Sequence, residues 1–155
     1  MDYAIKALLT EAYQKKASDL HISVGALPTL RLNGKLISVG ARTLTSNDTE
    51  QFLKDLIAEQ QYEKFLKKGE LDFSYGLEGV SRFRINAYKQ RGTVSLAIRV
   101  IPTRVPNLEE LGVPSVIKTF VEKPQGLILV TGPTGSGKST TLAALIDLIN
   151  RTQCK

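Results

Sequence analysis

The chain has 155 residues, of which 42% are hydrophobic, and a formal net charge of +6, which suffices for one domain of ordinary core size plus part of a second. No stretch approaches the roughly eighteen apolar residues that span a bilayer, and the N-terminus lacks the charged-then-apolar order of a secretory signal, so we expect a soluble cytoplasmic protein. A single cysteine, Cys154, and a single histidine, His21, exclude an internal disulfide and a structural zinc site.

The first forty residues predict a helix followed by short strands. Apolar residues at helical spacing predict an amphipathic helix over residues 3–16. Polar and apolar residues then alternate over 18–24, as in a half-buried strand. The runs 28–32 and 35–39 flank Asn33-Gly34, a pair that favours the two-residue turn of a β-hairpin.

Two further helices are expected before the chain returns to strands. The second helix begins after Asn47, because Glu50 lies three residues on, at the spacing of a capping box. The third helix covers 60–68 and ends at Gly69, a residue type that often follows the last turn of a helix.

An antiparallel meander follows, with strands expected over 71–75, 80–88 and 93–100. Alternation along the middle strand separates its side chains onto two faces. One face carries Arg82, Arg84 and Asn86, and the other carries Phe83, Ile85 and Ala87. Arg84 is therefore expected to face outward while Phe83 enters the core.

The next segment is interpreted as a linker between two domains. Its three prolines are Pro102, Pro106 and Pro114. Their spacing favours an extended connector over 101–113. We predict one domain over 1–100, with helices on a mainly antiparallel sheet, and the start of another over 114–155, opening with a short helix at 114–120.

Residues 126–140 contain a complete phosphate-binding loop. The pattern G-x-x-x-x-G-K-[ST] is filled by Gly132, Gly137, Lys138 and Ser139. An apolar run over 127–130 predicts a buried parallel strand before the loop, and residues 140–149 read as a helix after it. Strand, loop and helix in this order favour a nucleotide site over a chance match.

Each residue type in this loop has a physical function. Gly135 and Gly137 allow backbone conformations in which successive N–H groups point at one anion. Lys138 would place its charge against the β- and γ-phosphates, and Ser139 would offer its hydroxyl to Mg²⁺. The helix that begins near Lys138 would direct the positive end of its dipole to the phosphates.

Few residues follow this helix, so we interpret the chain as a truncated nucleotide hydrolase that lacks the later acidic residue needed to hold Mg²⁺. A single strand and helix cannot cover both faces of a parallel sheet. Five apolar side chains are then expected to lack partners: Leu127, Leu129, Leu142, Leu145 and Ile146. The C-terminal piece is expected to fray, to pack on the preceding domain, or to associate with another copy of itself.

Positive charge concentrates between residues 82 and 104, where no acidic residue occurs. The six cations are Arg82, Arg84, Lys89, Arg91, Arg99 and Arg104. Five of the six are arginines, which suit bidentate recognition of phosphate oxygens. Charge alone leaves open whether that phosphate belongs to a nucleic acid or to ATP.

Several segments in this order resemble one family. They are Ala17-Ser18-Asp19-Leu20-His21-Ile22, Asp72-Phe73-Ser74-Tyr75-Gly76, Arg82-Phe83-Arg84-Ile85-Asn86, Gln90-Arg91-Gly92 and the loop 131–143. Together they resemble the PilT-like type IV pilus retraction ATPases of the secretion ATPase superfamily, over the whole chain. The resemblance implies an α/β chain: an α+β PAS-like N-terminal domain, then the first strand, P-loop and helix of a RecA-like domain.

The resemblance also implies a hexameric motor that binds ATP and Mg²⁺ between the two domains. Lys138, Arg84 and Arg99 match catalytic positions, the two arginines being aimed at the terminal phosphate. The matching nucleotide contacts are Gly132, Thr134, Gly135, Ser136, Gly137, Lys138, Ser139 and Thr140. Ser139 would also bind Mg²⁺ through its hydroxyl, whereas the Walker B segment and later motifs would lie beyond Lys155, so we expect this chain alone not to be catalytically competent.

The implied partners are five further copies in a homo-hexamer and an inner-membrane pilus platform protein, which places the protein at the inner face of the cytoplasmic membrane. Retraction is favoured because assembly and type II secretion members carry an additional N-terminal domain, although a fragment of such a member is the alternative. A basic nucleic-acid-binding domain is disfavoured, since only Phe83 and Tyr88 could stack on bases, and on opposite faces. A pure interaction module remains compatible. His21 is interpreted as a packed or hydrogen-bonded side chain, and Cys154 is given no function.

Overall fold

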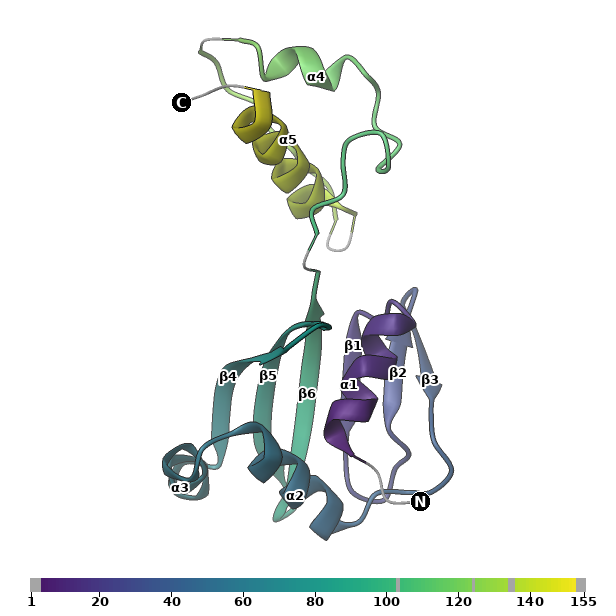
Figure 1. Cartoon of the computed structure of the whole chain (residues 1–155), viewed down its shortest axis with the longest axis vertical. Coiled ribbons are helices and arrows are strands. Elements are labelled where there is room, and N and C mark those ends of the chain that lie inside the picture. The colour runs from purple at the N-terminus through teal and green to yellow at the C-terminus, as the bar shows by residue number, and fades with distance from the viewer. Residues whose placement is uncertain (1–3, 103, 124, 134–135, 153–155) are drawn as a thin grey trace. The chain divides into compact units, whose positions relative to one another are not determined.

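The computed structural model describes residues 4–102, 104–123, 125–133 and 136–152. The chain divides into two compact units, Met1–Thr103 and Arg104–Lys155 (Figure 1). Each unit is described by itself. No helix in the described ranges has the length and apolar character needed to cross a membrane.

The first unit contains a six-stranded antiparallel sheet with the order β3-β2-β1-β6-β5-β4. Its strands are β1 (Asp19–Ile22), β2 (Thr29–Leu32), β3 (Lys35–Ser38), β4 (Glu70–Leu77), β5 (Ser81–Gln90) and β6 (Thr93–Ile101). The predicted meander β4–β5–β6 is confirmed. The predicted hairpin is also confirmed, because Asn33 and Gly34 join β2 to β3 with positive φ angles of 49° and 81°.

Three helices cover one face of this sheet: α1 (Ile5–Gln14), α2 (Ser46–Leu56) and α3 (Glu59–Lys68) (Figure 1). Their apolar stripes meet the inward side chains of the strands in one core. The largest fully buried side chains include Leu9, Leu53, Phe65 and Phe83. The opposite face of the sheet is free to carry polar residues, and this layering confirms the predicted mixed helix-and-sheet fold.

The start of α2 differs from the expectation. Its N-cap is Thr45, whose hydroxyl oxygen accepts a hydrogen bond from the Asp48 amide, while the Asp48 carboxylate accepts one from the Thr45 amide at 2.7 Å. The expected pair of Asn47 and Glu50 is therefore wrong. Both boxes have three-residue spacing, but Glu50 instead accepts hydrogen bonds from Lys54 and from the Tyr62 hydroxyl.

The second unit has a small core of its own. It contains the short helix α4 (Ile117–Phe120) and the longer α5 (Lys138–Thr152). Leu108, Ala144 and Leu145 are buried together in this core. Residues 104–113, which the sequence assigns to a linker, thus supply part of the packing of this unit.

The expected strand over 127–130 is not formed. A strand needs hydrogen bonds from a neighbour, and the described residues of the second unit include no other strand. Leu127 and Leu129 are consequently 82% and 75% exposed, as expected for side chains without partners. Leu142 and Ile146 are also exposed, but the same expectation is wrong for Leu145, which is 6% exposed because it faces Leu108.

Candidate functional site

The phosphate-binding loop leads directly into α5, which begins at Lys138. The first helical hydrogen bond is donated by the Thr141 amide to the carbonyl oxygen of Gly137 at 2.9 Å. Gly137 has a φ of +88°, a left-handed conformation that glycine adopts without a Cβ clash. The loop therefore turns into the helix so that the free amides of the first turn face outward from its N-terminus.

Gly132 and Ser136 are in close approach across the loop. Gly132 has a φ of +146°, and a Cβ on it would lie 2.8 Å from the Ser136 hydroxyl oxygen. The Ser136 amide donates to the carbonyl oxygen of Pro133 at 3.3 Å, which closes the turn. Thr134 and Gly135, two of the expected nucleotide contacts, lie outside the described residues.

Lys138, the charged residue of the motif, contacts the backbone of its own loop. The Lys138 ammonium donates a hydrogen bond to the carbonyl oxygen of Pro133 at 2.6 Å. Ser139 and Thr140 are exposed in the first turn of α5. A cation, two hydroxyls and the positive end of a 15-residue helix are thus within one short segment, which suits an anion with several oxygens.

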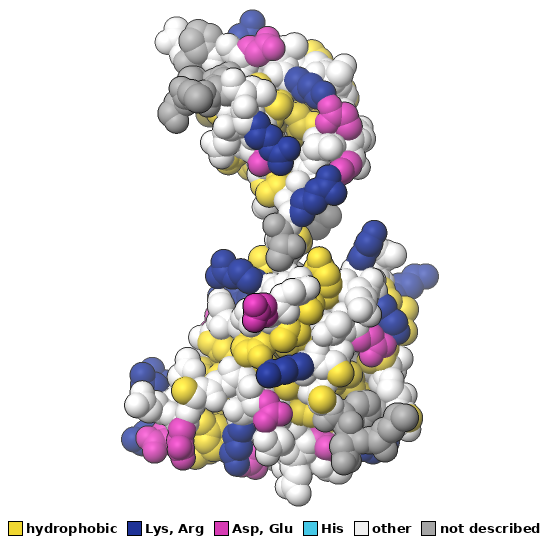
Figure 2. Space-filling model, viewed as in Figure 1, with side chains coloured by type: hydrophobic (Ala, Val, Ile, Leu, Met, Phe, Trp, Pro, Cys, Tyr) yellow, Lys and Arg dark blue, Asp and Glu magenta, His cyan; other side chains and the backbone are white. Residues whose placement is uncertain are grey.

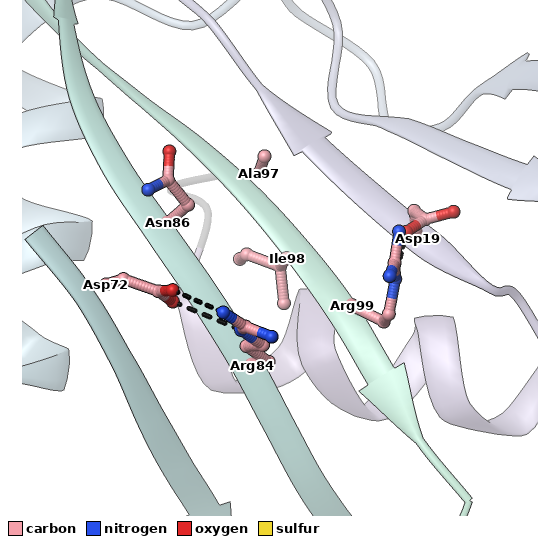
Figure 3. Close-up of a pocket in the computed structure, with 7 residues that line it drawn as sticks. All are labelled: Asp19, Asp72, Arg84, Asn86, Ala97, Ile98 and Arg99. Carbon is pink, nitrogen blue, oxygen red and sulfur yellow. Dashed lines mark hydrogen bonds and ion pairs between the residues drawn. The ribbon is translucent and has the colours of Figure 1, made fainter.

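A second candidate site lies on the polar face of the sheet in the first unit. A depression of about 250 Å³ opens there (Figure 3). It is lined by Asp19, Asp72, Arg84, Asn86, Ala97, Ile98 and Arg99. These residues come from β1, β4, β5 and β6, so four strands build the site.

Strand register brings the two candidate arginines together. Arg84 on β5 lies directly opposite Arg99 on β6, and Arg99 lies directly opposite Asp19 on β1. Along β5, exposed and buried residues alternate from Ser81 to Ala87. The expectation that Arg84 faces outward while Phe83 enters the core is confirmed.

Two carboxylates neutralise part of this charge. Arg84 and Asp72 form a two-point contact, Nη2 to Oδ2 at 2.6 Å and Nε to Oδ1 at 3.4 Å (Figure 3). Asp19 accepts a hydrogen bond from Arg99 Nε at 3.2 Å through Oδ1 and pairs with Arg31 Nε at 3.4 Å through Oδ2. Hydrogen bonding from Arg84 lowers the pKa of the Asp72 carboxyl and raises that of the guanidinium. This cluster of three guanidinium groups and two carboxylates carries a net positive charge.

Sequence reasoning assigned no role to Asp19, Asp72 or Arg31. The segments that contain Asp19 and Asp72 were singled out, but the pairing of β1 with β6 was needed to place Asp19 beside Arg99. Asp72 meets Arg84 across the predicted pair of β4 and β5. Alternation alone would have set Asp72 on the polar face of its strand. Because the expected meander makes β5 the neighbour of β4, this contact could have been found from the sequence.

The remaining cations of the 82–104 stretch do not join this site. Lys89 donates to the carbonyl oxygen of Leu66 and lies 5.9 Å from the centroid of the Phe65 ring. Arg104 belongs to the second unit, where it pairs with Glu110 at 2.6 Å. On the helix-covered face that Figure 2 shows, Lys and Arg side chains lie among acidic and apolar ones. The basic stretch is therefore not one continuous surface.

Comparison with known proteins defines the family. A family model described as Type II/IV secretion system protein matches residues 1–155, and the chain belongs to this family. The chain is 41% identical over 149 residues to the Type IV pilus retractation ATPase PilT of Pseudomonas aeruginosa, covering 96% of this chain and 43% of that protein. It is 32% identical over 160 residues to the Type II secretion system protein E of Dickeya dadantii, covering 94% and 31%.

A solved structure is also similar. The crystal structure of the pilus retraction motor PilT with bound ADP has a TM-score of 0.80 and 39% identity, covering 97% of this chain and 44% of that one. The chain thus spans less than half the length of the curated relatives it matches. The recognition made from the sequence motifs is confirmed at the level of the family.

Proposed function

We propose that this chain is the nucleotide-binding part of a motor ATPase that powers type IV pilus retraction. The observation that carries the proposal is an exposed arginine pair, Arg84 opposite Arg99, in a chain whose phosphate-binding loop opens a 15-residue helix. Membership of the secretion ATPase family and similarity to a retraction motor that binds ADP support it.

In this proposal the loop binds the triphosphate. Backbone amides of the loop and of the first turn of α5 would donate to the phosphate oxygens, and Lys138 would exchange the Pro133 carbonyl for a β- or γ-phosphate oxygen. The hydroxyl of Ser139 is exposed, and a hard oxygen ligand of this kind suits Mg²⁺. The metal, when bound, offsets charge that develops on the phosphates during transfer.

The arginine pair recognises the terminal phosphate. Two guanidinium groups would stabilise charge on the transferring phosphoryl group, and their attraction to the nucleotide falls once the phosphate leaves. This loss of attraction after hydrolysis would convert chemistry into motion. A homo-hexamer, an inner-membrane platform protein as docking partner, and a position at the inner face of the membrane belong to the same proposal.

Two alternative functions have less support than this proposal. Similarity to a type II secretion ATPase supports that related motor as the second candidate, with the same nucleotide chemistry. A nucleic-acid-binding role has less support, because Phe83 is 0% exposed and cannot stack on a base.

The test uses the polypeptide encoded by the whole gene and follows ATP hydrolysis and ATP affinity separately. Arg84→Ala and Arg99→Ala are each expected to lower kcat by about 10²-fold or more, with only a small change in nucleotide affinity. Arg82→Ala, an exposed arginine on the same face of β5, is the matched control. Equal losses of rate and affinity in the two test variants would count against a role in the transition state.

A further inference from the structure

The two arginines of the site are held by their carboxylates in different ways. What we infer from this difference rests on the proposed function and deepens it. Arg99 meets Asp19 through one nitrogen, whereas Arg84 meets Asp72 through two. An arginine that recognises phosphate uses its N–H groups in pairs. Which N–H groups a carboxylate already occupies therefore decides what remains for a nucleotide.

Asp19 is itself fixed in place. Its Oδ2 accepts a hydrogen bond from the Ser18 hydroxyl at 2.9 Å and pairs with Arg31 Nε at 3.4 Å. Its Oδ1 is left to accept from Arg99 Nε at 3.2 Å. The Asp19 side chain is only 17% exposed, so the carboxylate is a firm anchor on the sheet.

Asp19 holds Arg99 at Nε, the nitrogen nearest the backbone end of the guanidinium. The contact uses Nε, and within the described ranges the structure gives its two terminal nitrogens no hydrogen-bond partner. The Arg99 side chain is 72% exposed. Both Nη groups can thus approach phosphate oxygens while Asp19 still fixes the direction of the guanidinium.

Arg84 is held along its Nε/Nη2 edge, one of the two edges with which a guanidinium can bind phosphate in a bidentate way. Nε and Nη2 both contact Asp72, and the shorter distance is 2.6 Å. Asp72 is 45% exposed, and among the described residues Arg84 is its sole side-chain partner. Figure 3 shows this pair side by side, with both contacts on one edge of the guanidinium. Arg84 can present this edge to a nucleotide only after it gives up at least one contact with Asp72.

We propose that Asp19 is a positioning residue that directs Arg99 at the terminal phosphate of the nucleotide, whereas Asp72 is a competing acceptor that Arg84 leaves when the nucleotide binds. The two carboxylates then have opposite effects. Loss of Asp19 removes pre-organisation of a group needed in the transition state. Loss of Asp72 removes a competitor for an arginine that the nucleotide needs.

The test measures kcat and KM for Mg·ATP in the protein encoded by the whole gene. Asp19→Asn, which keeps the shape and removes the charge, is expected to lower kcat about tenfold with little change in KM. In an Arg99→Ala background the same substitution is expected to have no further effect, because Asp19 acts through Arg99. Asp72→Asn is expected to lower KM about threefold and not to lower kcat. Asp55→Asn, an exposed aspartate on α2, is the control.

Each result has a distinct meaning. If Asp19→Asn lowers kcat as much with Arg99 absent as with it present, Asp19 is structural and the proposal is overturned. A rise in KM for Asp72→Asn overturns the competing role. If Arg99→Ala itself leaves kcat unchanged, the proposed function fails instead. A thermal melt of each variant identifies a general folding defect, and Asp19→Glu, which keeps the charge, is expected to recover part of the rate.

Discussion

The carboxylate of Asp48 offers the sharpest test of how the first unit is held together. It accepts hydrogen bonds from Arg42 Nη1 at 2.7 Å and Nη2 at 2.8 Å, and from the amide and hydroxyl of Thr45 at 2.7 Å each. Asp48→Ala removes both the Arg42 pair and half of the capping box of α2. One side chain thus connects the helix start to the loop before it.

The magnitude follows from these contacts. Loss of an N-terminal capping interaction costs about 1 kcal/mol. The Arg42 pair adds about 0.5–1 kcal/mol, because the arginine side chain is partly exposed and solvent screens the charge. We expect Asp48→Ala to lower the free energy of unfolding by about 2 kcal/mol in total, or the Tm by about 8–15 °C for a unit of this size.

The same contacts predict a pH dependence. Hydrogen bonds from Arg42, then from the Thr45 backbone, lower the pKa of Asp48 far below its usual range. Because the folded pKa is lower than the unfolded value of about 4, the stabilisation is present above that value. It is lost as the pH falls toward the folded pKa. The difference between Asp48→Ala and the parent is therefore expected to be constant above about pH 5 and to shrink below about pH 4.

Unfolding is best followed by resolved amide signals of α2, because a chain with two compact units need not unfold in one step. Asp55→Ala is the matched control, since Asp55 is an exposed aspartate of the same helix that, within the described residues, accepts a side-chain hydrogen bond only from Gln51. The reasoning is refuted if the two variants lose equal stability, or if the loss for Asp48→Ala is as large at about pH 2 as at pH 7.

Two further predictions concern packing in each unit. Phe83→Ala, in the centre of the first core, is expected to lower the free energy of unfolding by about 3–5 kcal/mol because it leaves a cavity. Hydrogen exchange of β5 and β6 amides measures this loss. A loss no larger than that for exposed Arg82→Ala would contradict the expectation. Leu129→Ser, at a 75% exposed position, is expected to change stability by less than about 0.5 kcal/mol. The same substitution is expected to reduce self-association in sedimentation velocity, and unchanged association would argue against contact between copies at this segment.

Periodicity and turn chemistry predicted most of the first unit. The helix 3–16, the Asn33-Gly34 hairpin and the meander from 71 to 100 depend on neighbours in sequence, and the structure confirms all three. The prediction for the cap of α2 was wrong because two pairs with three-residue spacing occur there, Thr45 with Asp48 and Asn47 with Glu50. Asp48 also pairs with Arg42, whereas Glu50 accepts hydrogen bonds from Lys54 and Tyr62.

Long-range pairing decided what the sequence left open. The segment 127–130 has the composition of a buried strand, yet without a neighbour to hydrogen-bond it forms none in the described structure. Asp19 and Arg99 are 80 residues apart and meet only because β1 pairs with β6. The sequence by itself determined the phosphate-binding loop, because that chemistry lies in consecutive residues. The contact of Asp19 with Arg99 was decided by tertiary structure, since no local pattern specifies that β1 becomes the neighbour of β6.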